Sequence, residues 1–398
     1  MSLVCVLYDD ARAASWYPFT LTRPAGELLF GAYTARERVE AALGIRCIGH
    51  LAADRLAGFD EYGCAPVLTR ASVPQNAARL FLNSRFLPDW SAGFTEPRGA
   101  VAIVAGDRTA GWYAPAGVAA PDPAGLGPDS GRDGAEMPGT FLEDVWDLVD
   151  GNPAQLAADL SRGPASDAAP LPAHVHRIGP AADVRAAPDV VVEPDVVIDV
   201  TEGPVLLDAG VRVRAFTRLA GPAYIGRETT LLGGSISGVS IGAHCKVRGE
   251  IEASVMLGYA NKAHDGFLGH AYVGRWVNLG ALTTNSDLKN NYRPVRVRMP
   301  EGERDTGRIK IGCFLGDHVR TAIGTLLNTG TVVGPGATLF GRAMPPKLVA
   351  PLDWGGGGET RYELDRFLET AATVMARRGV VLSDGMRRVF TALRDSLP

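Results

Sequence analysis

The sequence is poor in cysteine, nearly balanced in charge and without a long apolar run. Its five cysteines, among 398 residues, are odd in number and widely spaced. That pattern excludes a disulfide framework and a zinc motif, and it favours a reducing, cytoplasmic location. The 40 Lys and Arg residues against 44 Asp and Glu residues give a net charge of −4, so no basic field recommends nucleic acid as a partner. No uncharged apolar window of about 18 residues occurs, so no membrane span is expected.

What the sequence does contain is a six-residue repeat. Its apolar residues recur at Leu207, Val213, Leu219, Ile225 and Leu231, at Ile241 and Val247, at Phe267, Val273 and Leu279, and at Leu327, Val333 and Leu339. Neither a strand nor a helix has this period. A hexapeptide repeat does, because each repeat forms one flat side of a triangular β-helix coil with its apolar residue pointing inward. The coils bury this face only against one another, so a stacked left-handed parallel β-helix is predicted.

The remaining sequence predicts a second domain. At this length two domains are the prior expectation. The N-terminal part lacks the repeat and alternates strand and helix patterns, which is typical of an α/β (Rossmann-like) layer structure. The predicted organisation is an α/β domain over 1–165, a linker over 166–177, the β-helix over 178–345 and a helical tail over 346–398.

His264 interrupts the repeat and is the candidate catalytic base. A neutral imidazole can take the proton from an amine or hydroxyl as it attacks a thioester near neutral pH. Amide side chains that follow, Asn278 and Asn285 among them, could orient the acceptor or the thioester carbonyl. A single histidine is more often structural, so the interruption of the repeat and the Asn-rich segment after it carry this hypothesis.

The segment from His264 to Ala281 resembles the acetyltransferase half of the bifunctional N-acetylglucosamine-1-phosphate uridyltransferase/glucosamine-1-phosphate acetyltransferase family. The shared pattern is a histidine, an aromatic residue three positions on, Leu-Gly, and then Val-Asn-Leu-Gly-Ala. The resemblance implies His264 as general base, Asn278 near the acceptor sugar and Ala281 near coenzyme A. The co-substrate would be acetyl-CoA or another acyl-CoA, and the acceptor a sugar phosphate or nucleotide-sugar.

Three departures from that family bear on the acceptor. Phe267 stands where the family has tyrosine, so one hydroxyl contact is missing. The family's phosphate-binding lysines are replaced by Glu252 and its neighbour, and a carboxylate would repel a phosphate, unless Lys246, Arg248 or Lys262 supplies the charge. The family has an Asn-Tyr pair at the coenzyme A site soon after the alanine. In this chain the pair comes later, as Asn291 and Tyr292.

The N-terminal segment 7–24 resembles a divergent branch of the sugar nucleotidyltransferases. Asp9, Asp10 and Arg12 replace the glycine-rich loop, and Pro18-Phe19-Thr20 matches Pro-Leu-Thr. Arg23 stands for the family's lysine. The resemblance implies that Arg12 and Arg23 bind the phosphates of a nucleoside triphosphate, which guanidinium groups do bidentately. Solvated turn residues and surface arginines are the alternative reading.

Nucleotidyl transfer in this family uses Mg²⁺, and the expected metal-binding aspartate is missing. Its position falls near Asn83, in a segment without a carboxylate. Asn152 resembles the second metal-binding motif, and Asp9, Asp10 or Asp107 are the candidate substitutes. Pyrophosphorylase turnover is therefore expected to be slow or absent.

Two classes of function remain open. One is a sugar-nucleotide biosynthesis enzyme that transfers an acyl group from coenzyme A to an aminosugar and binds or transfers nucleotide at its N-terminal domain. The other is a non-catalytic nucleotide-sugar-binding scaffold or regulator. Both readings expect a homotrimer, because prisms of this kind leave a flat face that three chains can share.

Overall fold

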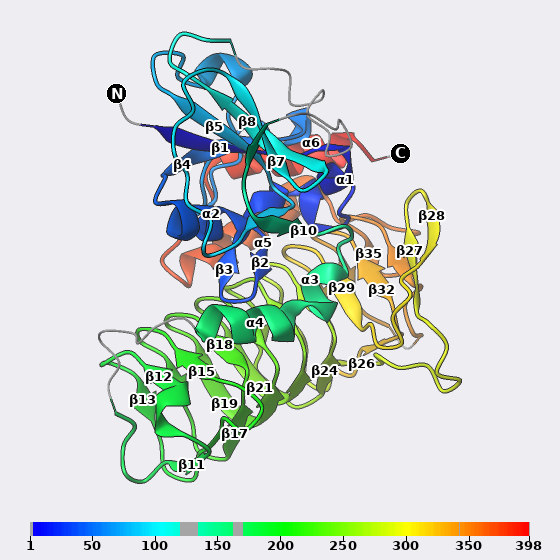
Figure 1. The fold of residues 1–398 in the computed structure, drawn as a ribbon. Coiled ribbons are helices and arrows are strands. Elements are labelled where there is room, and N and C mark those ends of the chain that lie inside the picture. The colour runs from blue at the N-terminus through cyan, green and yellow to red at the C-terminus, as the bar shows by residue number, and fades with distance from the viewer. Residues whose placement is uncertain (1–2, 120–133, 162–169, 342, 398) are drawn as a thin grey trace. The chain divides into compact units, whose positions relative to one another are not determined.

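The computed structural model describes residues 3–119, 134–161, 170–341 and 343–397, which form two compact units. One comprises Met1–Leu28, Tyr33–Val145 and Met375–Pro398, and the other Leu29–Ala32 and Trp146–Val374. The expected α/β domain, left-handed β-helix and helical tail are confirmed (Figure 1).

The units do not follow the four predicted ranges. Part of the N-terminal range groups with the β-helix, and the end of the predicted tail groups with the N-terminal unit. Within the predicted linker, residues 166–169 lie outside the described residues.

A six-stranded sheet is the centre of the N-terminal unit. In spatial order it contains β4 (Cys47–Leu51), β1 (Val4–Tyr8), β5 (Arg79–Asn83), β8 (Arg108–Ala114), β7 (Val101–Ala105) and β9 (Gly134–Glu136). β1 runs parallel to both β4 and β5, so the carboxyl ends of these three strands meet at one edge. β8 is antiparallel to β5 and β7. Apart from the partly exposed Val4, the residues of β1 and β5 are buried, as in strands covered on both faces.

Short helices and strands surround this sheet. They are α1 (Ala11–Ala14), η1 (Phe19–Leu21), η2 (Ala25–Glu27), β3 (Tyr33–Thr34), α2 (Ala35–Leu43), η3 (Asp54–Leu56), η4 (Arg70–Ser72), β6 (Phe86–Pro88), β10 (Gly139–Phe141) and α6 (Asp384–Asp395). α2 begins with a capping box between Thr34 and Glu37. It ends at Gly44, whose φ of 68° is left-handed. Ser383 caps α6, and its hydroxyl also bonds Asp60.

Three parallel faces build the β-helix. The first runs β12 (Val184–Ala186), β15 (Val205–Leu207), β18 (Ala223–Ile225), β20 (Ser240–Ile241), β22 (Val255–Met256), β25 (Tyr272–Val273), β29 (Cys313–Leu315), β32 (Thr331–Val333) and β34 (Leu348–Val349). The second has β13 (Val191–Val192), β16 (Arg212–Val213), β23 (Asn261–Lys262), β30 (Arg320–Thr321), β33 (Thr338–Leu339) and β35 (Trp354–Gly355). The third has β11 (His176–Ile178), β14 (Val197–Asp199), β17 (Thr217–Ala220), β24 (Phe267–Gly269), β26 (Thr284–Asn285) and β31 (Leu326–Leu327). The longer strands β19 (Thr230–Ser237) and β21 (Lys246–Glu252) pass from the second face to the third.

The repeat residues form the inner column of this prism, with one correction. All of them except Phe267 are at most 2% exposed. Phe267 pairs with Glu250 on the outer side, and its neighbour Leu268 is the inward residue, paired with Ile251. The chain between Leu268 and Val273 is shorter than one repeat, so counting back from Val273 selects the wrong residue.

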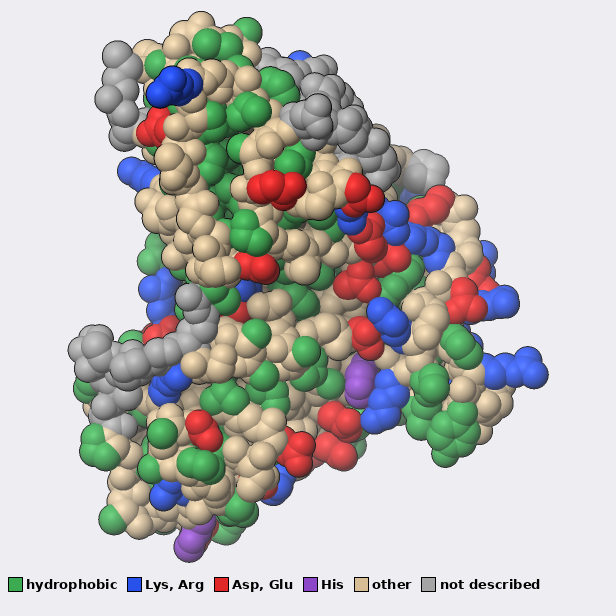
Figure 2. Space-filling model, viewed as in Figure 1, with side chains coloured by type: hydrophobic (Ala, Val, Ile, Leu, Met, Phe, Trp, Pro, Cys, Tyr) green, Lys and Arg blue, Asp and Glu red, His purple; other side chains and the backbone are tan. Residues whose placement is uncertain are grey.

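A hairpin interrupts the β-helix, and the prism departs from the prediction at its end. The hairpin is β27 (Arg296–Met299) and β28 (Gly302–Asp305), in the polar segment between β26 and β29. Charged side chains of both signs cover it (Figure 2), including an ion pair between Arg296 and Glu303. The prism continues past Pro345-Pro346, because β34 and β35 add one more pair of strands. The tail helix α5 (Leu364–Ala376) follows.

Segments from the first 161 residues are bound to the β-helix. They are β2 (Leu29–Phe30), α3 (Asp147–Asp150) and α4 (Asn152–Leu160), and α4 lies along the coils beside β18 (Figure 1). The buried Asn152 accepts hydrogen bonds at Oδ1 from Gly31 N, at 2.9 Å, and from Ser240 Oγ, at 2.9 Å. Leu29 N donates to Tyr272 Oη at 2.8 Å. No helix of the described residues has the length and apolar character needed to cross a bilayer.

A buried ion cluster around Glu27 ties several loops to the N-terminal sheet. Its carboxylate accepts from Arg36 Nε at 2.6 Å and Ala65 N at 2.9 Å, and His50 Nε2 lies 2.9 Å away. Burial alone would raise the pKa of Glu27, but the hydrogen bond and charge of His50 and the charge of Arg36 outweigh it and lower the pKa to about 2. The ionised form is therefore the stabilising one.

Glu27 should contribute to acid unfolding. Its pKa is lowered on folding, so its stabilisation is complete above the unfolded value of 4.5 and is lost as the pH falls toward about 2. The loss is on the order of 3 kcal/mol. Chemical unfolding followed at several pH values should show a shallower acid dependence for Glu27→Gln than for the wild type. Equal slopes for the two proteins would contradict this assignment.

Candidate functional sites

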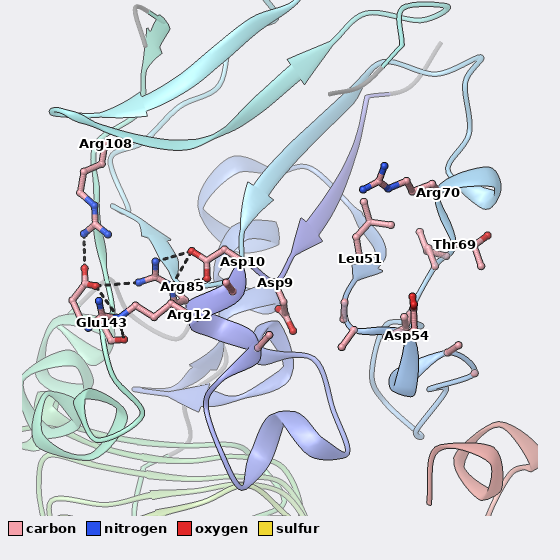
Figure 3. A pocket seen from close by; sticks show the side chains of 18 residues that line it. Asp9, Asp10, Arg12, Leu51, Asp54, Thr69, Arg70, Arg85, Arg108 and Glu143 are labelled. Carbon is pink, nitrogen blue, oxygen red and sulfur yellow. Dashed lines mark hydrogen bonds and ion pairs between the residues drawn. The ribbon is translucent and has the colours of Figure 1, made fainter. Parts of the chain in front are cut away.

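A cavity of about 940 Å³ opens at the edge of the N-terminal sheet where β1 and β4 end. Ligands of open α/β sheets bind at this kind of edge, outside the carboxyl ends of parallel strands. The cavity is lined by Asp9, Asp10, Ala11, Arg12, Ala14, Leu51, Ala52, Ala53, Asp54, Ala57, Gly58, Val67, Leu68, Thr69, Arg70, Arg85, Arg108 and Glu143 (Figure 3). Arg12, Arg85, Arg108 and Glu143 gather on one side of the cavity, whereas Leu51, Asp54, Thr69 and Arg70 lie on the other (Figure 3). The first side is the polar half; the second, which also includes the small residues Ala52 and Ala53 after β4, is less polar.

Asp10 and Arg85 form a buried ion pair in the polar half. Arg85 Nη2 lies 2.7 Å from Asp10 Oδ2, and Arg85 Nε lies 3.0 Å from Asp10 Oδ1. Asn83 Nδ2 donates to Asp10 Oδ2 at 2.8 Å, so the predicted residue Asn83 orients this carboxylate. Asp10 also accepts from Ala13 N and caps α1. Burial would raise the pKa of Asp10, but the hydrogen bond from Arg85 and these further bonds outweigh it and lower the pKa.

Glu143 joins three guanidinium groups at the mouth of the cavity. Its carboxylate lies 2.5 Å from Arg108 Nη1, 3.3 Å from Arg85 Nη1 and 3.3 Å from Arg12 Nε (Figure 3). Partial burial alone would raise the pKa of Glu143. The hydrogen bond and charge of Arg108 and the charges of Arg85 and Arg12 outweigh it, so the pKa is lowered. Arg12 makes a further ion pair with Asp144, at 3.3 Å.

The cavity brings together only some of the residues predicted to bind nucleotide. Asp9, Asp10 and Arg12 line it, and Asn83 supports it. Asp9 Oδ2 accepts from Ala25 N at 3.1 Å, and burial raises the pKa of this carboxyl. Arg23 does not line the cavity: it is 1% exposed and paired with Glu61 at 2.8 Å. Its guanidinium fills a structural position that a phosphate does not reach.

The carboxylates of this cavity fit a magnesium ion poorly. Asp9 Oδ1 makes no hydrogen bond, but burial raises the pKa of this carboxyl and so disfavours the charged form that Mg²⁺ requires. Asp10 is engaged by Arg85, and Glu143 by three arginines, so neither offers a free anionic oxygen. Asn152 belongs to the β-helix unit, where its Oδ1 already accepts two hydrogen bonds. Asp107 is exposed at the turn between β7 and β8 and does not line the cavity. No cluster of three His, Cys, Asp or Glu side chains suited to a metal occurs in the described part of the chain.

His264 lies exposed on the β-helix, in the turn between β23 and β24. Lys262, expected to contact an acceptor, instead takes an inward position in register with Val247 and is 1% exposed. Its Nζ donates to the carbonyl oxygens of Arg248, at 3.2 Å, and of His264, at 2.5 Å. Burial lowers the pKa of Lys262 to about 8. Lys262 therefore stabilises the turn at His264 from inside the β-helix, and its amino group is not exposed to solvent.

The predicted amide residues divide into exposed and buried ones. Asn278 is exposed, pairs with Asn261 on the next coil, and accepts at Oδ1 from Asn261 Nδ2 at 3.3 Å. Asn285 is buried and makes two bonds of 2.9 Å with the backbone N and O of Gly269. Those bonds give Asn285 a role in holding the coil, and they occupy the groups that an acceptor would need.

The residues expected near coenzyme A lie on loops after β25. Ala281 is half-buried, and its carbonyl accepts from Gly324 N at 2.8 Å. Asn291 and Tyr292 are exposed between β26 and β27, and Tyr292 has a left-handed φ of 53°. Within a single chain, Asn291 and Tyr292 are therefore open to solvent and Ala281 is partly so.

Sequence reasoning missed four charged residues that the fold places at these sites. Arg85 lies in the turn after β5, Arg108 begins β8 and Glu143 follows β10, and no local pattern connects them. His270 lies at the corner after β24, with its Nδ1 2.7 Å from Asp287 Oδ2. An imidazole oriented by a carboxylate is an arrangement found in general bases, and only the stacking of coils reveals it.

Comparison with known proteins supports the resemblances noted above. Residues 5–163 match the model of the family described as sugar nucleotidyl transferase. The chain is 30% identical over 91 residues to a bifunctional sugar-1-phosphate nucleotidylyltransferase/acetyltransferase of Sulfurisphaera tokodaii, covering 23% of each protein. It is 28% identical over 112 residues to the bifunctional protein GlmU of Methanocaldococcus jannaschii, covering 28% of this chain and 25% of that protein.

A third similarity concerns the putative uncharacterized acetyltransferase YaiX of Escherichia coli. Identity is 29% over 160 residues, covering 37% of this chain and 66% of YaiX. The chain thus spans about a quarter of the bifunctional relatives and about two thirds of YaiX. The Sulfurisphaera tokodaii and Escherichia coli relatives are named as transferases. Residues 5–163 therefore match a sugar nucleotidyl transferase domain, and the chain is similar, over about a quarter of their length, to two proteins named as bifunctional.

Proposed function

We propose that this protein is a sugar-nucleotide biosynthesis enzyme whose β-helix transfers an acetyl or other acyl group from coenzyme A to an aminosugar. The exposed imidazole of His264 carries this proposal, together with Asn261, three residues before it, which is hydrogen-bonded to Asn278. His264 takes the proton from the attacking amine as the new amide bond forms and the thiolate of coenzyme A departs. Asn278 hydrogen-bonds the acceptor. The acceptor is a sugar phosphate or a nucleotide-sugar.

The proposal extends to the assembly and the compartment. Coenzyme A binds near Ala281, Asn291 and Tyr292, in a groove completed by a neighbouring chain of a homotrimer. A loop of one prism facing the next is the arrangement that would enclose a long thioester around a closed axis. The five cysteines all lie within the described residues and form no disulfide, which favours a reducing, cytoplasmic compartment.

The purified protein tests the acyl transfer directly. It is incubated with acetyl-CoA and a panel of acceptors: glucosamine 1-phosphate, glucosamine 6-phosphate and amino-sugar nucleotides. Release of the coenzyme A thiol is followed with a thiol reagent, and the N-acyl product is identified by mass spectrometry. Thiol release that depends on one acceptor supports the proposal. Absence of acceptor-dependent release across the panel favours the non-catalytic scaffold.

At the N-terminal unit we propose binding of a nucleoside triphosphate or nucleotide-sugar, with slow or absent pyrophosphorylase turnover. The polar half of the cavity supplies guanidinium groups for phosphates, and its β4 side supplies small and aliphatic contacts for a base or sugar. The poor fit for Mg²⁺ is the reason to expect little turnover, because the metal neutralises the triphosphate in this chemistry.

Arg12→Ala is expected to weaken nucleotide or nucleotide-sugar binding by about 1.5–3 kcal/mol, the usual value of a charge-assisted hydrogen bond. Its side chain is 45% exposed, so folding should be preserved. Titration calorimetry with UTP, dTTP and their sugar conjugates measures the change. Arg46→Ala is the matched control, because Arg46 is exposed before β4 and does not line the cavity. Equal loss in both variants would point to a general charge effect.

A further inference from the structure

The three arginines around Glu143 form a prebuilt anion site. Arg85 is fixed by Asp10 and donates from Nη1 to the carbonyl oxygen of Leu142 at 2.6 Å. The guanidinium of Arg108 lies over the ring of Phe141, 4.0 Å from its centroid. Guanidinium groups held in place in this way lose little conformational freedom when an anion arrives.

Among the described residues, Glu143 is the partner that Arg12, Arg85 and Arg108 share. Its side chain is 37% exposed and lies after β10, outside any helix or strand, so solvent and a dissolved anion can reach the carboxylate. Asp10, in contrast, is buried and bound from several sides. An incoming anion would therefore displace Glu143 and leave the Asp10–Arg85 pair intact.

We propose that the diphosphate group of the ligand binds to Arg12, Arg85 and Arg108 without a divalent cation, and that Glu143 is the resident counter-ion it replaces. This inference rests on the nucleotide-binding part of the proposed function. It adds the residues that bind the phosphates and the independence of this binding from a divalent cation. The three fixed cations take the place of Mg²⁺ in neutralising the phosphates. Planar guanidinium forks bind both carboxylates and phosphates bidentately, but three of them together match the higher charge and the several oxygens of a diphosphate better than those of a single carboxylate.

Calorimetric titration with inorganic pyrophosphate, in EDTA and then with excess Mg²⁺, tests the inference. Glu143→Gln removes the competing charge and keeps the side-chain shape, so pyrophosphate should bind about tenfold more tightly. Arg108→Ala should weaken binding about ten- to a hundredfold. Glu136→Gln is the matched control, because Glu136 is an exposed glutamate of β9 that does not line the cavity.

The outcomes separate this inference from the proposed function. Binding that requires Mg²⁺, or Glu143→Gln affinity equal to or weaker than that of the wild type, overturns the inference. Pyrophosphate bound as described, with no affinity for any nucleotide or nucleotide-sugar, supports the anion site and refutes nucleotide recognition. Tight nucleotide binding that Glu143→Gln does not change refutes the counter-ion role and leaves nucleotide binding standing. Thermal unfolding of each variant establishes that it is folded.

Discussion

His264→Ala is expected to slow acyl transfer by about 10²–10⁴-fold, the range for losing a general base. The side chain is exposed at a turn and takes no part in the inner column, so stability should hardly change. The rate is measured as acceptor-dependent release of coenzyme A thiol. Light scattering of the same samples checks that the variant keeps the proposed trimer, and a monomeric mass for the wild type would contradict that assembly.

Two other histidines make the His264 experiment decisive. His176 is exposed on β11 and serves as the control, with wild-type activity expected for His176→Ala. His270 is the rival, because Asp287 orients its imidazole at a different corner of the prism. Full activity in His264→Ala together with a large loss in His270→Asn would transfer the role of base to His270.

Arg85→Ala is expected to destabilise the N-terminal unit by about 3–5 kcal/mol. The change removes one partner of a buried ion pair and leaves the Asp10 carboxylate without its counter-charge. Because a chain of two units need not unfold in one step, hydrogen exchange of the β1 and β5 amides is the suitable measurement. Loss of protection should be confined to this unit.

A second variant separates the ion pair from simple loss of packing. In the double variant Asp10→Asn, Arg85→Ala the unpaired buried charge is absent, so it should be less destabilised than the sum of the two single variants. Additive losses would show that the charges are not coupled. A loss below about 1 kcal/mol in Arg85→Ala would mean that water reaches Asp10 and the pair counts as a surface one.

The β-helix could be predicted because its information is local. One inward residue in each repeat must be apolar whatever the neighbouring coil contains, so Leu207 or Val333 reveals the period without knowledge of any partner. Lys262 could not be placed in this way: its register is inward, and only the carbonyl oxygens of Arg248 and His264 make that position tolerable. Phe267 shows the opposite error. Because the chain from Leu268 to Val273 is shorter than one repeat, the six-residue count assigned the inward position to Phe267 instead of Leu268.

The cavity was harder to predict because its contacts span the chain. Asp9, Asp10 and Arg12 follow β1 directly, so a strand ending in charged residues pointed to them. Arg85 lies 75 positions beyond Asp10, and the two meet because β1 and β5 are neighbours in the sheet. No residue spacing encodes that adjacency. Arg23 matched the family pattern in sequence, but its pairing with Glu61 depends on a loop that the pattern does not describe.

The attachment of Asn152 to Gly31 and Ser240 has a consequence for how this protein can be divided. The family match ends at residue 163, yet the helix that carries Asn152 completes the surface of the β-helix. A fragment ending near that boundary would take α4 away from the coils that it covers, and a fragment beginning there would leave Ser240 without its partners. An exchange of N-terminal modules between such proteins, in the laboratory or in evolution, must therefore include α4 with its Asn152 contacts. Otherwise the surface of the coils that α4 covers has to be redesigned.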